Sequence, residues 1–148
     1  MKENFMVETE FLFGFQPKDR RYNIVSSILK AYRATKSFSI YYPVTALIEV
    51  REVMASHGRS AEERFNALTF IRAKAATSNL LEVSLYSDDL ILCEEIMAQH
   101  ESLTFFDALH ASVALNNKLS VISNDEVYDR VGVNRISFKD LLNLLERS

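Results

Sequence analysis

The stretch that decides how this chain folds runs from Leu103 to Asp129 and reads LTFFDALHASVALNNKLSVISNDEVYD. Thr104 suits a helix N-cap, and Asp107 falls three residues later, in the first turn. The small and apolar residues that follow predict a helix that ends near Asn116 or Asn117 and covers a sheet, because nearly every face can approach a neighbour closely. After a polar break, the apolar run Leu119 to Ile122 indicates a central strand of a parallel sheet.

Two acidic residues of this stretch are predicted to meet. Asp125 lies in Ser123-Asn124-Asp125, directly after the predicted strand, while Asp107 opens the predicted helix. In a regularly wound α/β sheet each strand end faces a helix start, so both residues are expected at one edge. Open α/β sheets place their ligand sites at that edge.

The rest of the 148-residue chain alternates between strand and helix patterns, which predicts one domain, residues 1–148, with a parallel sheet and right-handed crossovers. The predicted strands are Asn4–Val7, Phe38–Tyr42, Leu80–Ser84, Leu119–Ile122 and Val133–Ser137. The predicted helices start near Asp19, Pro43, Ser60, Ser87, Thr104 and Ser137, and a short turn spans Glu126 to Arg130. Ser60 and Glu63 form a capping-box pattern.

The acidic motifs resemble those of the PIN domain family, the metal-dependent ribonuclease fold of VapC-type toxins. Its third acidic residue opens a D-A-hydrophobic-H/I-A helix, as Asp107-Ala108-Leu109-His110-Ala111 does, and its fourth follows a strand as T/S-x-D, as Asp125 does. Glu8-Thr9-Glu10 stands where the family commonly has D-T/S-N, and Glu49 matches the hydrophobic-x-E-hydrophobic position.

This resemblance covers almost the whole chain and implies a three-layer α/β/α fold. Its sheet would have five parallel strands in the order 3-2-1-4-5, which gathers Glu8, Glu49, Asp107 and Asp125 at one edge. Glu8 departs from the family, which has Asp at that position. The longer side chain brings the competence of the site into question.

Clustered carboxylates repel: two unit charges 4 Å apart interact by roughly 4 kcal/mol at an effective dielectric of about 20, so they protonate, spread apart or bind a cation. Oxygen ligands without cysteine favour Mg²⁺ or Mn²⁺. The four carboxylates are therefore predicted as metal ligands and catalytic residues. Auxiliary positions are Glu10, Ser123 and Asp129.

Two classes of function follow from the resemblance. The first is a metal-dependent endoribonuclease that hydrolyses RNA, similar to the toxin of a type II toxin-antitoxin pair, with an antitoxin protein and a homodimer as expected partners. The second is a degenerate PIN domain that binds RNA or protein without cleavage. A nucleotide-binding or receiver-like domain is less well supported, because no Gly-rich phosphate loop follows any predicted strand.

Each acidic residue also has a structural interpretation. Asp107 fits a charge at a helix start, Asp125 a helix cap, and Glu49 an ion-pair partner of Arg51 or Arg72. His110 lies one turn from Asp107, where it either orients that carboxylate or is a packed core histidine. Taken together, these interpretations leave unexplained why all four acidic residues fall at one edge.

The two halves of the chain differ in net charge. Residues 1–74 carry 12 Lys or Arg and 8 Asp or Glu, a balance of +4, whereas residues 75–148 carry 5 and 12, a balance of −7. Six basic residues of the first half are either phosphate contacts or a solvated helix face: Lys18, Arg20, Arg21, Lys30, Arg33 and Lys36.

Cys93 is the single cysteine, which excludes an internal disulfide and a multi-cysteine zinc site. No segment has membrane-spanning length or a leader pattern, so a cytoplasmic protein without a membrane partner is expected.

Overall fold

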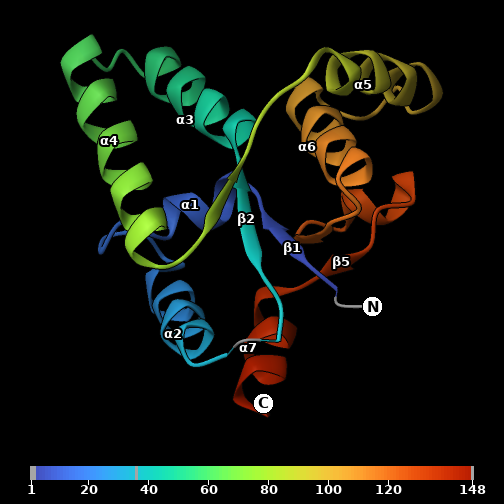
Figure 1. The fold of residues 1–148 in the computed structure, drawn as a ribbon. Coiled ribbons are helices and arrows are strands. Elements are labelled where there is room, and N and C mark those ends of the chain that lie inside the picture. The colour runs from blue at the N-terminus through green and yellow to red at the C-terminus, as the bar shows by residue number, and fades with distance from the viewer. Residues whose placement is uncertain (1–2, 36, 148) are drawn as a thin grey trace.

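A five-stranded parallel sheet forms the centre of the computed structural model, which describes residues 3–35 and 37–147 (Figure 1). The strand order is β3-β2-β1-β4-β5, and every pairing is parallel. The strands are β1 (Phe5–Val7), β2 (Ile40–Pro43), β3 (Leu81–Val83), β4 (Ser120–Ile122) and β5 (Arg135–Ile136). The predicted fold class and strand order are confirmed.

Helices connect these strands and include one that the sequence patterns did not predict. They are α1 (Thr9–Phe13), α2 (Tyr22–Arg33), α3 (Val44–Ser56), α4 (Ala61–Thr77), α5 (Ser87–Gln99), α6 (Phe105–Asn116), the 3-10 helix η1 (Glu126–Val131) and α7 (Phe138–Glu146). The unpredicted helix is α1, whose five residues are too few for a 3.6-residue periodicity to be recognised. It ends at Gly14, where a Cβ atom would stand 2.5 Å from Val25 Cγ2 and would push α2 away.

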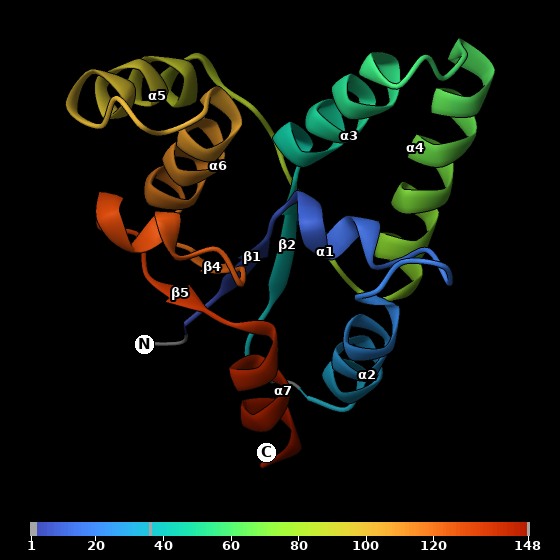
Figure 2. The ribbon, with the colours of Figure 1, turned by 180° about the vertical axis from the view of Figure 1, so that it is seen from behind.

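The sheet separates two apolar layers because neighbouring side chains on a strand point to opposite faces. Phe5 and Val7 of β1 belong to a core shared with α1, α2, α3, α4 and α7, whereas Met6 belongs to a core shared with α5, α6 and η1. Figures 1 and 2 show α5 and α6 on the side of the sheet opposite to α1 and α2. This is the three-layer arrangement that was expected.

Several predicted element ends are confirmed, while the strands are shorter than predicted. Ser60 and Glu63 form both hydrogen bonds of the capping box, and Thr104 and Ser137 accept from the third helical residue of α6 and α7. β2 begins at Ile40 and not at Phe38, whose ring packs against Phe5. Among the described residues, no helix combines the length and apolar character needed to cross a lipid bilayer.

Candidate active site

The four predicted carboxylates stand at the ends of separate elements on the carboxyl edge of the sheet. Glu8 follows β1 and is the N-cap of α1, and Asp125 follows β4 and is the N-cap of η1. These two strands are neighbours, with Val7 paired to Ile122. Glu49 lies in the second turn of α3 and Asp107 in the first turn of α6. The structure therefore brings all four to one edge, as the strand order requires.

The charges of the carboxylates at this edge affect one another's ionisation. The charges of Glu49 and Asp107 contribute to the raised pKa of Glu8, and those of Asp125 and Glu49 contribute to the raised pKa of Asp107. These charges shift the pKa of a neighbouring carboxyl group because burial weakens solvent screening. The cluster thus contains acidic groups that resist being charged together.

Glu8 is the most perturbed of the four. Only 6% of its surface is exposed, and its Oε1 accepts a hydrogen bond from the Glu10 backbone N–H at 3.0 Å. Burial, followed by the charge of Glu10, raises the pKa of Glu8 from 4.5 to about 8, although the hydrogen bond from Glu10 N–H opposes the shift. In the metal-free protein at neutral pH, Glu8 is therefore mostly a neutral carboxylic acid.

Asp107 and Asp125 serve as helix-end residues and members of the cluster at once. The Asp107 N–H donates to Thr104 Oγ1 at 3.2 Å, and Asp125 Oδ1 accepts from the Val127 N–H at 3.0 Å. Burial raises the pKa of Asp107, and the charges of Asp125 and Glu49 add to the shift against a hydrogen bond with Thr104. Asp125 is exposed. The structural interpretation of these two residues does not exclude the functional one.

Glu49 is held by a buried network around His110. Its Oε1 accepts hydrogen bonds from the Thr9 hydroxyl and from His110 Nε2, the latter at 2.8 Å. On the other side of the ring, His110 Nδ1 lies 2.9 Å from Thr45 Oγ1. A neutral imidazole with its proton on Nε2 satisfies both contacts, because the Thr45 hydroxyl can donate to Nδ1.

This network decides between the interpretations of Glu49 and His110. Glu49 is not the partner of Arg51 or Arg72; its contact is a hydrogen bond with His110, and Arg51 instead pairs with Glu52 at 2.8 Å. His110 is a buried core residue, as one interpretation held, and its hydrogen bonds orient Glu49 and not Asp107. Burial pushes the pKa of Glu49 upward, but the hydrogen bonds from His110 and Thr9 outweigh it and lower the pKa overall. Glu49 is thus kept ionised.

The three auxiliary positions have other partners. Glu10 lies 3.4 Å from Arg21, and Ser123 is buried with its hydroxyl accepting from the Asp125 N–H at 3.0 Å. Both carboxylate oxygens of Asp129 accept from Arg135, at 3.1 and 3.0 Å. Ser123 therefore supports Asp125, whereas Asp129 and Glu10 are already engaged by arginines.

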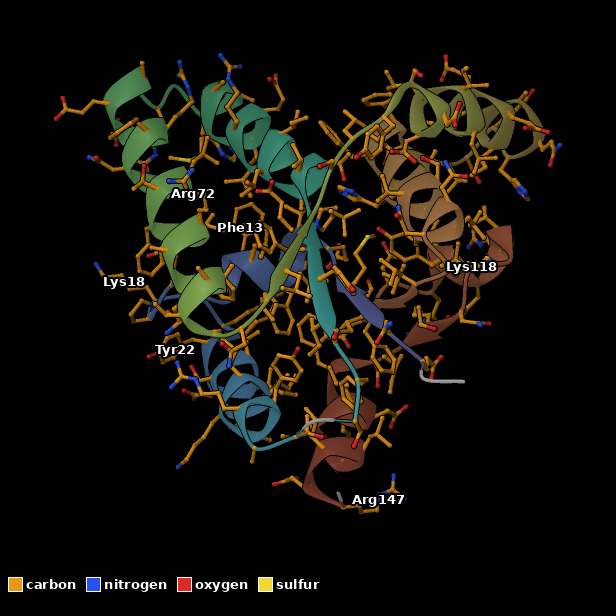
Figure 3. The ribbon with its side chains drawn as sticks, in the orientation of Figure 1. Phe13, Lys18, Tyr22, Arg72, Lys118 and Arg147 are labelled. Atoms are coloured by element: carbon orange, nitrogen blue, oxygen red, sulfur yellow. The ribbon has the colours of Figure 1, made fainter. Side chains whose placement is uncertain are left out.

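The basic residues of the first half differ in their partners and in their exposure. Arg21 binds Asp19 and Arg33 reaches the Thr77 carbonyl, while Lys36 lies outside the described residues. Figure 3 labels two basic side chains of the first half, Lys18 and Arg72, and both lie on the left of the view, whereas Lys118 and Arg147 of the second half lie elsewhere. Lys18, Arg20 and Lys30 are exposed, which agrees with a solvated surface.

Tyr128 is a member of the site that the sequence patterns missed. Its side chain is 1% exposed, and its hydroxyl has no hydrogen-bond partner among the described residues. Burial, and then the charges of Glu8, Asp107, Glu49 and Asp125, raises the pKa of Tyr128 well above its ordinary value. A signal was present: an aromatic residue three positions after Asp125, in an otherwise polar turn, suggests a buried anchor. Thr9 and Thr45 carried no such signal.

The donor set suits a hard divalent cation, although its ligands are not yet gathered. Carboxylate oxygens and a hydroxyl are the ligands that Mg²⁺ and Mn²⁺ prefer. Within residues 3–35 and 37–147, no three or more His, Cys, Asp or Glu side chains are arranged closely enough to hold a metal. One carboxylate oxygen of Glu8, Oε1, accepts from the Glu10 N–H.

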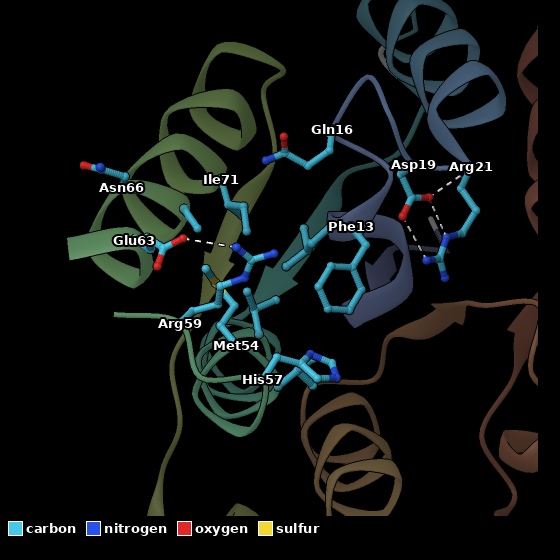
Figure 4. A pocket seen from close by; sticks show the side chains of 14 residues that line it. Phe13, Gln16, Asp19, Arg21, Met54, His57, Arg59, Glu63, Asn66 and Ile71 are labelled. Atoms are coloured by element: carbon cyan, nitrogen blue, oxygen red, sulfur yellow. Dashed lines mark hydrogen bonds and ion pairs between the residues drawn. The ribbon is translucent and has the colours of Figure 1, made fainter. Parts of the chain in front are cut away.

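A pocket of about 670 Å³ lies next to this cluster, between α1, α3 and α4 (Figure 4). Its lining includes Phe13, Val50 and Met54, with Arg59 and Glu63 at 3.2 Å from each other. None of the four carboxylates lines it. Its lining includes Val50, the residue after Glu49 in α3, and Arg21, which lies 3.4 Å from Glu10.

Comparisons with known proteins agree with this fold. VapC20 of Mycobacterium tuberculosis, described as a sarcin-ricin loop cleaving toxin, superimposes with a TM-score of 0.64 and 14% identity over 87% of this chain and 95% of its own. VapBC2 of Rickettsia felis, bound to a DNA fragment from their promoter, gives 0.62 and 17% over 90% of this chain and 98% of its own. A toxin-antitoxin complex from Klebsiella pneumoniae gives 0.59 and 13% over 90% and 97%.

At these identities the likeness to solved structures shows a shared fold. A comparison with curated protein sequences found no significant match. A family model described as PIN domain matches residues 5–134, which contain all four carboxylates of the acidic edge. The chain belongs to the PIN domain family.

Proposed function

We propose that this protein is a metal-dependent endoribonuclease that hydrolyses RNA phosphodiester bonds at the acidic edge. The observation that carries the proposal is that four carboxylates from four separate segments stand at one edge of the sheet, where burial, with the charges of neighbouring carboxylates adding to it, raises the pKa of Glu8 and Asp107. Retaining such repulsion costs stability in the absence of a cation. A bound cation removes that cost, so the arrangement is what a cation-binding site requires.

In this proposal Glu8, Glu49, Asp107 and Asp125 hold Mg²⁺ or Mn²⁺. When bound, such a cation neutralises charge on a phosphodiester and makes an attacking water more acidic. The protein's own residues prepare the ligands: His110 and Thr9 keep the Glu49 carboxylate ionised and oriented, and Ser123 supports the turn that presents Asp125. Asp125 is exposed, so an extended single strand of RNA can approach it from solvent.

The direct test is an RNA cleavage assay with the purified protein in Mg²⁺ or Mn²⁺. We expect cleavage of single-stranded RNA that is lost on chelation and abolished by Asp125→Asn, which removes a negative ligand and keeps the shape of the side chain. Asp140→Asn is a matched control, because Asp140 is an exposed carboxylate at the start of α7. Cleavage that survives both chelation and Asp125→Asn comes from a contaminant and refutes the proposal.

A degenerate PIN domain that binds without cutting is the second candidate, and one observation favours it. The Glu8 carboxylate is buried, bonded to the Glu10 N–H and mostly protonated at neutral pH. A neutral carboxylic acid is a poor cation ligand. Glu8→Asp separates the candidates: a rise or fall in cleavage rate supports the nuclease, whereas metal binding without cleavage in every variant supports the binding module.

The partners are part of the same proposal. An antitoxin protein that blocks the site would find an apolar surface with a charged rim in the pocket between α1, α3 and α4, next to Glu49. A homodimer would cover exposed apolar side chains on α5 and at the start of α6, such as Ile91, which is 67% exposed, and Phe105, which is 44% exposed. Slowed growth on expression and copurification of a small partner test the first idea, and light scattering tests the second. The antitoxin proposal is abandoned if expression does not slow growth and no small partner copurifies.

A further inference from the structure

Tyr128 is a buried side chain whose polar atom has no hydrogen-bond partner among the described residues. It lies in η1, three residues after Asp125, and packs in the core formed with α6. A hydroxyl loses water on burial and normally regains a hydrogen bond from the protein. Among the described residues no atom accepts from the Tyr128 hydroxyl. Such an exception calls for an acceptor that the ligand-free arrangement does not provide.

The surroundings of Tyr128 identify where that acceptor lies. The 3-10 helix η1 follows β4, the strand that pairs with β1, and Met6 of β1 packs in the same core as Tyr128, so Tyr128 and Glu8 belong to neighbouring strand ends. Burial, and then the charges of the four carboxylates with Glu8 first among them, raises the pKa of the Tyr128 hydroxyl, which therefore keeps the proton that it can donate. Glu49 already accepts from Thr9 and His110. Asp125 is exposed and can use solvent. Glu8 is buried, with one donor, the Glu10 N–H, on Oε1 and none found among the described residues for Oε2.

We propose that Tyr128 is a positioning residue for Glu8: its hydroxyl donates a hydrogen bond to the Glu8 carboxylate when that carboxylate holds a divalent cation. The inference rests on the proposed metal site. A hydrogen bond to a ligating carboxylate fixes its orientation, and loss of such a supporting partner typically weakens metal affinity by roughly 10- to 100-fold. The longer, more flexible glutamate at this position has the greater need of such support.

The experiment measures Mn²⁺ binding by calorimetry on the full chain, without RNA, together with thermal unfolding in chelator. Tyr128→Phe removes the hydroxyl and keeps the ring. We expect a Kd roughly 10-fold weaker. In chelator we expect an unfolding midpoint equal to that of the parent or roughly 2–4 °C higher, because an unsatisfied buried hydroxyl has been removed.

Tyr32→Phe is the matched control. The Tyr32 hydroxyl accepts from the Ile40 N–H at 3.0 Å, at the amino end of β2 and therefore at the opposite edge of the sheet. This variant should lower the unfolding midpoint and leave the Mn²⁺ affinity unchanged. The opposite signs of the two stability changes distinguish an unsatisfied hydroxyl from a satisfied one.

A double-mutant cycle with Glu8→Gln tests the route of the effect. If Tyr128 acts through Glu8, then Tyr128→Phe causes little further loss of affinity in the Glu8→Gln background. Unchanged Mn²⁺ affinity in Tyr128→Phe overturns the inference and leaves the proposed nuclease intact. The same conclusion follows if Tyr128→Phe weakens Mn²⁺ affinity as much in the Glu8→Gln background as in the parent. A lowered midpoint for metal-free Tyr128→Phe also overturns it. If the parent binds no Mn²⁺, the metal site itself fails and the inference falls with it.

Discussion

Replacing Glu8 by Gln should change how stability depends on pH, because the native protein holds a proton on this carboxyl that the unfolded chain releases. Burial and the neighbouring charge of Glu10 raise its pKa from 4.5 to about 8, a displacement equivalent to about 5 kcal/mol. The stabilisation is complete below the unfolded pKa and is lost as pH rises towards the folded pKa. Between these two values the metal-free parent should become steadily less stable.

Glutamine is neutral at every pH and mimics the protonated side chain. Denaturant unfolding in chelator, at several pH values from about 5 to about 8, should therefore show a gap between Glu8→Gln and the parent. The gap should widen in favour of the variant by up to about 5 kcal/mol. Comparing the two proteins cancels the contributions of all other titrating groups. Parallel stability curves across this range would refute the reasoning, since they would mean that Glu8 titrates alike in the folded and unfolded states.

Two further outcomes test how the site is supported. Asp129→Asn should leave the cation-dependent cleavage rate within about twofold of the parent, because Arg135 already binds both Asp129 oxygens. A loss of rate as large as that of Asp125→Asn would mean that Asp129 is a metal ligand. Thr45→Val should destabilise the protein by roughly 1–3 kcal/mol, because it removes a buried hydroxyl 2.9 Å from His110 Nδ1 and leaves that nitrogen unpaired. Urea unfolding measures this cost, and an unchanged free energy of unfolding would show that the ring has another partner.

Features that depend on local pattern were predictable from the order of the residues alone. Alternating strand and helix patterns predicted the α/β class, and the caps Ser60, Thr104 and Ser137 located three helix starts, because a capping bond joins residues only three positions apart. The resemblance of short acidic motifs to the PIN family added the strand order, which the sheet confirms. From that order, the meeting of four carboxylates at one edge followed without side-chain detail.

The partner of each of these groups, and the charge that it carries, depend on how the elements pack in three dimensions. Glu49 meets Thr9 and His110, which are 40 and 61 positions away, while its neighbour Arg51 turns to Glu52. No periodicity encodes such long-range pairing, because it depends on how two packed elements are rotated about their axes. The protonation of Glu8 likewise depends on burial that arises only when α1 closes over the end of β1. The unsatisfied hydroxyl of Tyr128 has the same origin: its ring is drawn into the core by apolar burial, and this carries its polar atom to the acidic edge.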